Sequence, residues 1–401
     1  MFVYADNAAT TAVSKKVLES MIPYFSEVYG NPSSLYSVGQ KAKEVLEESR
    51  ERIAKLIGAD TKEIYFTSGG SEADNQAIIS AARIGEKQGK KHIISTAFEH
   101  HAVLHTLKEL EKEGFEVTLL DVHSNGVITP EQVADAIRED TALVTVMYAN
   151  NEIGTIQPIA EIGAICKEKG VIFHTDAVQA VSHVHINVKE ENIDMLSISA
   201  HKFHGPKGVG VLYVRKGVRL TNIINGGAQE SGKRAGTENL AGIVGMTVAL
   251  EDAIANIDAN NERLAKLQDK LIEGLSKIPY SELNGDREKR VKSNVNFCFE
   301  GVEGESLLLL LDDKGVAVSS GSACTSGSLD PSHVLLAIGR PHEVAHGSLR
   351  ISLGEDATEE QVQYIIDSVT EVIEYLRSFS PFWRDLVGGK RPHVFKEYSV
   401  A

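Results

Sequence analysis

The sequence predicts an α/β fold built around a mostly parallel sheet, and two observations carry this prediction. Short β-rich runs alternate with helical stretches through roughly the first 215 residues, which is the pattern of repeated βαβ units. Several of these runs end in polar or ionisable residues, and in open α/β sheets the ligand crevice lies at the carboxyl ends of the strands. The predicted strands cover residues 63–67, 92–95, 143–148, 171–175, 195–199 and 210–214.

Apolar stripes at helical spacing predict three helices. Gly58 follows the first stripe where a C-terminal cap is expected, and the second stripe stops at Pro279, which cannot continue a helix. Thr358 and Gln361 form a possible capping box that opens the third helix, and the segment after it, SPFWRDLVGGKRPHVFKEYSVA, is predicted to be an irregular tail. The stripes are Ala42, Val45, Leu46, Ile53, Leu56 and Ile57; Leu264, Leu267, Leu271 and Leu275; and Val362, Ile365, Ile366, Val369, Ile373 and Leu376.

The length of 401 residues favours two domains, or one large domain with a smaller one packed on it. The polar stretch DANNE, which begins at Asp258, is the candidate boundary. The net charge of −15 argues against direct binding to nucleic acid or to an anionic membrane, because both need a basic surface. Three cysteines in so long a chain are typical of a reducing compartment. With no signal peptide or membrane-length apolar run, we expect a cytoplasmic protein.

Lys202 is the first candidate for chemistry. It lies in SAHKFHGPKG, between the predicted strands DMLSIS and VGVLYV. A lysine at such a turn can attach a carbonyl cofactor as a Schiff base, while neighbouring donors hold a phosphate. A lone lysine is far more often a solvated surface residue, so this interpretation depends on companions elsewhere in the chain.

Asp176 and His100 are two such companions. Asp176 follows the strand VIFHT, where its carboxylate could keep a pyridine nitrogen protonated and so make the ring an electron sink. Gln179 could donate a hydrogen bond to the phenolic oxygen of that ring. A helix N-cap is about as frequent a role for an isolated strand-end aspartate. His100 could lie over the ring and move protons, although a surface or core role is the alternative and His101 is adjacent.

The turn TSGGSE offers a third companion, a phosphate site. It follows the strand EIYF and opens a predicted helix, so bare backbone N–H groups and the helix N-terminus would both favour an anion. Ser71 would add a hydroxyl. An ordinary strand-to-helix turn capped by Ser71 is the alternative.

Cys324 lies in the Gly/Ser-rich stretch SSGSACTSGS. Such a stretch has weak conformational preference, so the thiol could travel between a buried cofactor and the surface. Such travel suits a carrier, provided that the site deprotonates the thiol. A small buried residue is the alternative, and it is the role expected for Cys166, which shares a helical face with Ile162 and Ile165. Cys298 is expected in a strand, with no chemical role.

Arg350, in GSLRIS, could hold a substrate carboxylate with its two-pronged guanidinium, and a structural ion pair is the competing interpretation. Asn151 and Asn31 are weaker polar candidates, because both lie in segments that resemble turns, where asparagine is common. No metal site is predicted.

Taken in order, these motifs resemble one family, the cysteine desulfurases of the NifS and IscS type, which belong to the fold type I pyridoxal-phosphate enzymes related to class V aminotransferases. The resemblance runs nearly end to end. Tyr36 stands where related chains often have histidine, and Ser71 where many have threonine, but neither change removes a group that the chemistry needs. The matching motifs are YADNAATT, GNPSS, TSGGSEADN, NNEIGTIQP, DAVQ, SAHKFHGPKG, RAGTEN, SSGSACTSGSLDPSHVL and GSLRISLG.

The resemblance implies a role for each candidate. Lys202 would bind pyridoxal phosphate covalently, His100 would stack on its ring, Asp176 would pair with the ring nitrogen, and Gln179 and Asn151 would contact cofactor or substrate. Thr237 would reach the phosphate of a neighbouring subunit, so the enzyme would be a homodimer. Arg350 would bind the cysteine carboxylate and Cys324 would be the nucleophile. The phosphate would be held by Gly70, Ser71, Ser199 and His201.

The implied reaction converts L-cysteine to L-alanine and leaves a persulfide on Cys324, whose sulfur an iron–sulfur scaffold or sulfur-relay protein would accept. The large cofactor-binding domain would cover residues 14–258. Residues 1–13 and 259–401 would form a smaller α+β domain that carries Cys324 and the C-terminal tail. An aminotransferase or selenocysteine lyase on the same fold, or a non-catalytic assembly subunit, are the alternatives.

Overall fold

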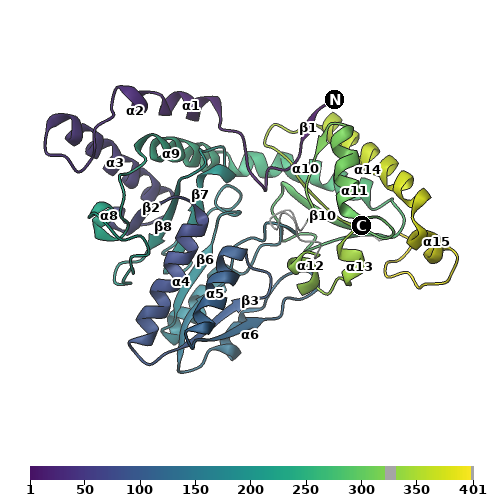
Figure 1. Cartoon of the computed structure of the whole chain (residues 1–401), viewed down its shortest axis with the longest axis horizontal. Coiled ribbons are helices and arrows are strands. Elements are labelled where there is room, and N and C mark those ends of the chain that lie inside the picture. Colours follow the sequence, from purple (N-terminus) through teal and green to yellow (C-terminus); the bar gives the residue numbers. More distant parts are fainter. Residues whose placement is uncertain (321–330, 399–401) are drawn as a thin grey trace.

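The computed structural model describes residues 1–320 and 331–398. It contains a seven-stranded sheet, which lies in the left part of the molecule in Figure 1. Its strand order is β2-β8-β7-β6-β5-β3-β4. All neighbours pair in parallel except β8, which is antiparallel to both β2 and β7. The strands are β2 (Ile64–Thr67), β3 (His92–Thr96), β4 (Glu116–Leu120), β5 (Thr141–Thr145), β6 (Ile172–Asp176), β7 (Met195–Ser199) and β8 (Gly210–Val214).

Each predicted strand is present, and the largest shift in bounds is at β5, which was predicted over 143–148. Beyond Thr145 the chain stays extended, because Val146 and Tyr148 still donate backbone hydrogen bonds to the carbonyl oxygens of β6 residues. One strand of this sheet, β4, was not predicted. It forms the edge of the sheet and is only partly buried, so its sequence lacks the apolar run that revealed the other strands.

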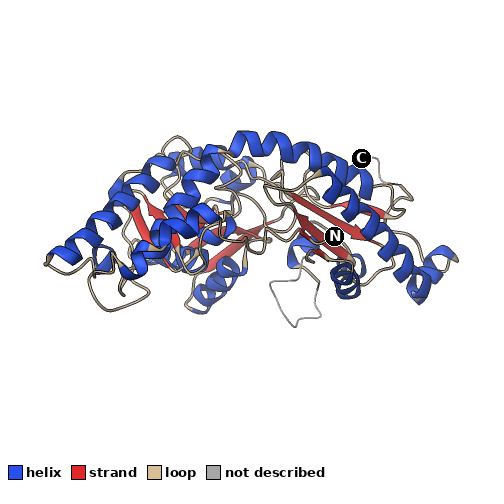
Figure 2. Cartoon of the chain, turned by 90° about the horizontal axis from the view of Figure 1, so that it is seen from above, coloured by secondary structure: helices blue, strands red, loops and turns tan. Residues whose placement is uncertain are grey.

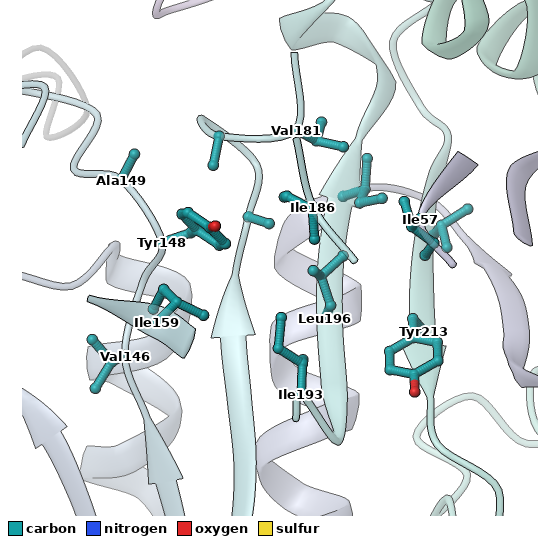
Figure 3. Close-up of a cluster of buried hydrophobic side chains, with 14 of the residues drawn as sticks. Ile57, Val146, Tyr148, Ala149, Ile159, Val181, Ile186, Ile193, Leu196 and Tyr213 are labelled. Atoms are coloured by element: carbon teal, nitrogen blue, oxygen red, sulfur yellow. The ribbon is translucent and has the colours of Figure 1, made fainter. Parts of the chain in front are cut away.

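Helices cover both faces of this sheet. Because successive residues of a strand point to opposite faces, neighbouring side chains of one strand pack against different helices. Ile93 and Ile94, adjacent in β3, are both fully buried but belong to different hydrophobic clusters. Figure 3 shows part of the larger cluster, with Leu196 and Tyr213 on neighbouring strands. The smaller cluster, which contains Ile93, includes side chains of α4 (Gly70–Glu86) and α5 (His101–Lys112). The larger cluster, which contains Ile94, includes side chains of α1 (Lys15–Met21), α3 (Ser37–Leu56), α6 (Pro130–Ala136), α7 (Ile159–Lys169) and α9 (Leu240–Ala255).

A separate hydrophobic cluster surrounds a small antiparallel sheet of order β12-β10-β9, on the right of Figure 1. The N-terminal residues reach this side of the molecule because β1 pairs in parallel with β11. We therefore retain the proposed division in which residues 1–13 join the smaller domain. The elements are β1 (Val3–Tyr4), β9 (Ser281–Leu283), β10 (Asn294–Phe299), β11 (Val316–Ala317), β12 (Ser348–Ser352), α10 (Ile257–Leu275), α11 (Gly304–Asp313) and α14 (Glu359–Phe379).

The helix ends match the sequence signals. Gly58 follows α3 with a φ of +72°, and Thr358 and Gln361 form the capping box of α14. The polar stretch DANNE forms the first turns of α10, and the break between α9 and α10 falls at Asn256. Figure 2, which views the molecule from above, shows the run of helices that joins its two parts.

The prediction of a wholly irregular C-terminal tail was wrong. Residues Pro381–Val387 form helix α15, whose first turn is capped by the Ser380 hydroxyl, which accepts a hydrogen bond from the backbone N–H of Trp383. Serine at the cap followed by proline is a helix-start signal that the sequence carried. The remaining short helices are α2 (Pro23–Ser26), α8 (Gln229–Gly232), α12 (His333–Ala337) and α13 (His342–Ala345), and the 3-10 turns are η1 (Thr61–Glu63) and η2 (Ala200–Lys202).

Within residues 1–320 and 331–398, none of the helices has both the length and the apolar character that crossing a membrane requires. The pair α9 and α10 meets that test only when the two are joined across a bend of 66°.

Candidate active site

The carboxyl ends of β3, β6 and β7 lie at one edge of the large sheet, since these strands all run in parallel with β5 or with one another. β6 ends at Asp176 and β7 at Ser199, while His100 follows β3 and immediately precedes α5. Residues from three separate stretches of sequence therefore come to the same edge, as the rule for open α/β sheets requires.

Lys202 lies in the 3-10 turn η2 that follows β7. Its Nζ donates hydrogen bonds to the carbonyl oxygens of Ala8, at 2.7 Å, and Ala9, at 2.8 Å. The Gln179 Nε2 donates to the same Ala8 oxygen at 2.9 Å. The ammonium group is thus held by the N-terminal segment rather than left in solvent, and Gln179 lies beside it. Lys202 and Gln179 line a cavity of about 30 Å³ together with Asn150.

Asp176 is buried at the end of β6, with an exposed fraction of 5%. Its Oδ1 accepts a hydrogen bond from the backbone N–H of Val178 at 2.9 Å, so the alternative role in capping the following turn is also present. Burial raises the pKa of Asp176, and the positive charge of Lys202 opposes this rise. A buried carboxylate that is stabilised by a nearby cation suits a protonated ring nitrogen.

His100 is the N-cap residue of α5, because its Nδ1 accepts a hydrogen bond from the backbone N–H of Ala102 at 3.2 Å. Since Nδ1 is the acceptor, Nε2 carries the hydrogen in the neutral ring. Burial, and to a smaller extent the positive charge of Lys202, lower the pKa of His100 to about 4. At neutral pH the imidazole is therefore uncharged, so it can stack on a ring, and its Nδ1 can accept a proton once that atom releases the Ala102 N–H.

The turn before α4 forms a cradle that a side chain at Gly70 would fill. A Cβ at Gly70 would lie 2.7 Å from Val178 Cγ2 and 3.5 Å from Ser199 Cβ, and one at Gly69 would lie 3.7 Å from Ser199 Oγ. The N-cap of α4 is Gly69 and no side chain caps the helix, so the alternative in which Ser71 is the cap is wrong. Backbone N–H groups at the start of this 17-residue helix, with Ser199 facing them, fit a phosphate group.

His201, which precedes Lys202 in the chain, also contacts the N-terminal segment. Its Nδ1 lies 3.1 Å from the Thr10 hydroxyl, and burial lowers the pKa of His201 to about 4, with a further contribution from the charge of Lys202. The described residues thus contain the parts that a pyridine-ring aldehyde with a phosphate arm needs: an amine, an acid group, and an anion cradle. Between residues 1–320 and 331–398, no group of three or more His, Cys, Asp or Glu side chains could hold a metal ion.

Arg350 is buried in β12, with an exposed fraction of 2%. Its Nη2 lies 2.9 Å from Asp6 Oδ1 and its Nη1 donates to the carbonyl oxygen of Asn151 at 3.1 Å, so the competing interpretation as a structural ion pair is present. The Nε of Arg350 is buried and has no hydrogen-bond partner among the residues that the structure describes. One donor of the guanidinium therefore stays available for a carboxylate.

Two predicted residues do not come to Lys202 within this chain. Asn31 is exposed, and its Oδ1 accepts a hydrogen bond from the Ser33 N–H of its own turn. It belongs to the connection between α2 and α3, two helices that Figure 1 draws on the opposite side of the molecule from β10. Thr237 is exposed in the loop before α9. Neither residue lines the cavity that contains Lys202.

Cys324 lies outside the described residues, but the chain on either side of it is placed. Ser319 exchanges two backbone hydrogen bonds with Arg350, at 2.7 and 3.1 Å, and Ser332 donates a hydrogen bond to Glu152. The chain therefore leaves and re-enters the described structure beside the candidate substrate-binding arginine. Cys166 is buried as expected, and Cys298 lies in strand β10 as expected and is buried there. Burial raises the pKa of Cys166 to about 12 and that of Cys298 to about 11.

A polar layer beneath Asp176 was not predicted. His174 lies two residues before Asp176 on β6, so both side chains are on the same face of the sheet. Its ring nitrogens lie 2.8 Å from Thr145 Oγ1 and 3.0 Å from Ser197 Oγ, and Asp74 Oδ1 lies 3.6 Å from Nε2. Burial lowers the pKa of His174 to about 3, so the ring is neutral and the contact with Asp74 is not an ion pair. The alternation of the strand motif FHTD, which places His174 and Asp176 on one face, was the sequence signal that could have revealed this polar layer.

We expect the stability deficit of His174→Gln relative to the unsubstituted protein to narrow as the pH falls from 7.5 to 5. The unfolded chain binds a proton at this histidine below a pKa of ~6.5, whereas the folded chain does not until pH is near its folded pKa of about 3. Stability that the histidine contributes is therefore lost as the pH falls through 6.5, by roughly 2 kcal/mol at pH 5. Urea unfolding of the cofactor-free proteins at both pH values measures the difference, and parallel losses in the two proteins would contradict the assignment of a neutral buried ring.

Comparison with known proteins identifies relatives over nearly the whole chain. Residues 3–365 match the model of the aminotransferase class-V family. The chain is 55% identical over 391 residues to the cysteine desulfurase IscS of Clostridium botulinum, covering 97% of this chain and 98% of that protein.

Among solved structures, a NifS-like protein superposes with a TM-score of 0.88 at 40% identity, covering 94% of this chain and all of that one. A structure described as SspA in complex with cysteine superposes with a TM-score of 0.77 at 39% identity, covering 88% of this chain and 98% of that one.

Proposed function

This chain belongs to the class-V aminotransferase family, and we propose that within the family it is a cysteine desulfurase, which converts L-cysteine to L-alanine and holds the released sulfur as a persulfide on Cys324. The observation that carries this proposal is the convergence of Lys202, Asp176 and His100 at one sheet edge, in a chain 55% identical to a curated cysteine desulfurase. The cysteine bound to a structural neighbour supports the choice of substrate.

Pyridoxal phosphate is the proposed cofactor, because the donor set fits it. Lys202 would bind the aldehyde, Asp176 would face the ring nitrogen, Gln179 the phenolic oxygen, and His100 the ring face. When bound, the cofactor supplies an electron sink for the substrate amino acid. The phosphate would be held by Gly70, Ser71, Ser199 and His201.

The chain's own residues would orient the substrate and move its protons. Arg350 and Asn151 would bind the cysteine carboxylate, and the buried Nε of Arg350 without a partner supports this role. Lys202 or the neutral His100 would take the α-proton, and the lowered pKa of His100 keeps its imidazole uncharged at neutral pH.

The Cys324 thiolate would then attack the substrate sulfur. An S–S bond forms as the substrate Cβ–S bond breaks, and the electron pair of the broken bond stays with the carbon skeleton. That carbon takes up a proton to give alanine. One sulfur atom has moved from substrate to enzyme, and no external oxidant is needed.

A homodimer is the proposed assembly, in which Thr237 completes the phosphate site of the second copy and Asn31 approaches its substrate. The exposure of both residues, away from Lys202 of their own chain, supports this arrangement. We propose that the persulfide passes to a protein acceptor, an iron–sulfur scaffold or a sulfur-relay protein, in the cytoplasm.

We expect Cys324→Ser to abolish sulfide release from L-cysteine while the visible absorbance of the bound cofactor is unchanged. The nucleophile would be missing, but none of the groups proposed to hold the cofactor would change. A sulfide assay with an added thiol, which reduces the persulfide and so releases its sulfur as sulfide, and mass spectrometry of the protein after one turnover measure the result. Cys166→Ser is the matched control, because that thiol is buried and should carry no sulfur. Unchanged sulfide release from Cys324→Ser would assign the chemistry elsewhere.

A further inference from the structure

Glu152 is a buried carboxyl group that none of the proposed chemical steps uses. It follows Asn151 in the turn after β5, with an exposed fraction of 4%. Its backbone is fixed on both sides: its N–H donates to Asn150 Oδ1 at 2.9 Å, and its carbonyl oxygen accepts from Asn296 Nδ2 at 3.1 Å. A carboxyl group in such a rigid, buried place needs a structural or functional reason.

The side chain of Glu152 contacts the far end of the segment that carries Cys324. The Ser332 hydroxyl donates to Glu152 Oε2, and its oxygen accepts from the N–H groups of Val334, at 3.1 Å, and Leu335, at 3.3 Å. The hydrogen and both lone pairs of the hydroxyl of this buried serine are therefore engaged. Its hydroxyl hydrogen points at Glu152 and its lone pairs hold the first turn of α12, so the carboxylate fixes the start of that helix.

The same carboxylate lies within the electrostatic influence of Arg350. Burial raises the pKa of Glu152 to about 7, and the Ser332 hydrogen bond and the Arg350 charge oppose the rise. Arg350 itself contacts Asp6 and the Asn151 carbonyl oxygen, and its backbone pairs with Ser319 at the near end of the same segment. Both ends of the segment that carries Cys324 are thus attached beside one arginine.

We propose that Glu152 is a positioning residue for sulfur transfer: through Ser332 it fixes the end of the Cys324 segment relative to the substrate carboxylate site at Arg350. This inference rests on the proposed function, since it assigns Glu152 to the persulfide-forming step and not to the steps at the α-carbon. Above a pH of about 7 the ionised group accepts a charge-assisted hydrogen bond, which is stronger than the neutral one.

Two variants separate this role from a general loss of structure. Glu152→Gln keeps the volume and one acceptor but removes the charge, and Ser332→Ala removes the donor. The matched control is Glu63→Gln, because Glu63 is equally buried, at 4% exposed, and its carboxylate accepts backbone hydrogen bonds from Asp60 and Lys216 at a distant edge of the sheet. All three are prepared with bound cofactor.

The two chemical steps are then measured apart. Exchange of the α-proton of L-alanine in deuterated water, followed by NMR, reports the steps that do not use Cys324, and we expect it to change by less than about threefold in every variant. Single-turnover persulfide formation at Cys324, followed by mass, should fall about tenfold or more in Glu152→Gln and Ser332→Ala at pH 8, and not in Glu63→Gln.

The pH profile supplies the readout that a merely structural role would not move. Cys324 is unchanged in every variant, so pH effects that do not involve Glu152 cancel in the ratio of the unsubstituted rate to the Glu152→Gln rate. This ratio should approach one as the pH falls below about 7, because the unsubstituted carboxyl group then loses its charge. In the same cofactor-bound proteins, amide hydrogen exchange at Val334 and Leu335 should be faster in both variants than in the control.

The inference is overturned if α-proton exchange and persulfide formation fall together, if neither changes, or if the rate ratio does not depend on pH. An unsubstituted protein that exchanges the α-proton yet forms no persulfide would instead refute the proposed function. The two failures are therefore distinguishable.

Discussion

Lys202→Ala should abolish sulfide release from L-cysteine and remove the visible absorbance of the bound cofactor. The substitution deletes the amine that would bind the aldehyde and one of the two groups that could take the α-proton. Loss of a positioned base alone lowers a rate by ~10²–10⁴, so we expect the turnover to fall by at least about 10³-fold. Absorbance spectra of the purified protein and a sulfide assay measure the two effects.

The matched control for this substitution is Lys207→Ala. Lys207 lies on the same connection after β7 and, like Lys202, donates to a carbonyl oxygen of the N-terminal segment, that of Thr11, at 2.9 Å. Its replacement removes a similar hydrogen bond, worth about 1 kcal/mol of stability, but leaves absorbance and sulfide release in place. If the Lys202 variant kept its absorbance, or if both variants lost it equally, the assignment of the cofactor amine would be wrong.

The strands of the large sheet could be predicted because most are buried on both faces, which leaves continuous apolar runs in the sequence. β7, for example, was predicted with its bounds correct. β4 was missed for the opposite reason: Glu116 and Leu119 are exposed at the edge of the sheet, so no apolar run forms. The short helix α15 was missed because its start signal, Ser380 with Pro381, is followed by an irregular composition.

The site residues that follow strands could be predicted because a parallel sheet brings the carboxyl ends of its strands together, whatever their separation in sequence. Partners contributed from distant segments could not. Asp6 lies 344 residues from Arg350, and Ser332 lies 180 residues from Glu152. Burial also decides the chemistry of the carboxyl groups: it raises the pKa of Glu99 to about 8, although the sequence presents Glu99 as one acid among many.

Asp176→Asn should lower sulfide release by at least about 10³-fold and weaken binding of pyridoxal phosphate to the cofactor-free protein. An amide has nearly the same shape as the carboxylate but carries no negative charge, so it cannot keep the ring nitrogen protonated, and the electron sink would be lost. Sulfide release measures the rate. Quenching of the fluorescence of Trp383 by added cofactor, or equilibrium dialysis, measures binding independently of turnover.

Asp74→Asn is the control that makes this prediction specific to position. Asp74 is even more buried than Asp176, and burial raises its pKa well above the ordinary value, with the charge of Asp176 adding to the rise. The charge of Lys202 counteracts the rise at Asp176 alone, so the negative charge is favoured on Asp176, and we expect Asp74 to hold a proton. An amide in place of a protonated acid changes little, and Asp74→Asn should retain sulfide release within about fivefold. Equal losses from the two substitutions would show that the charge lies on Asp74 as well, and the ring nitrogen would then have to be assigned a different partner.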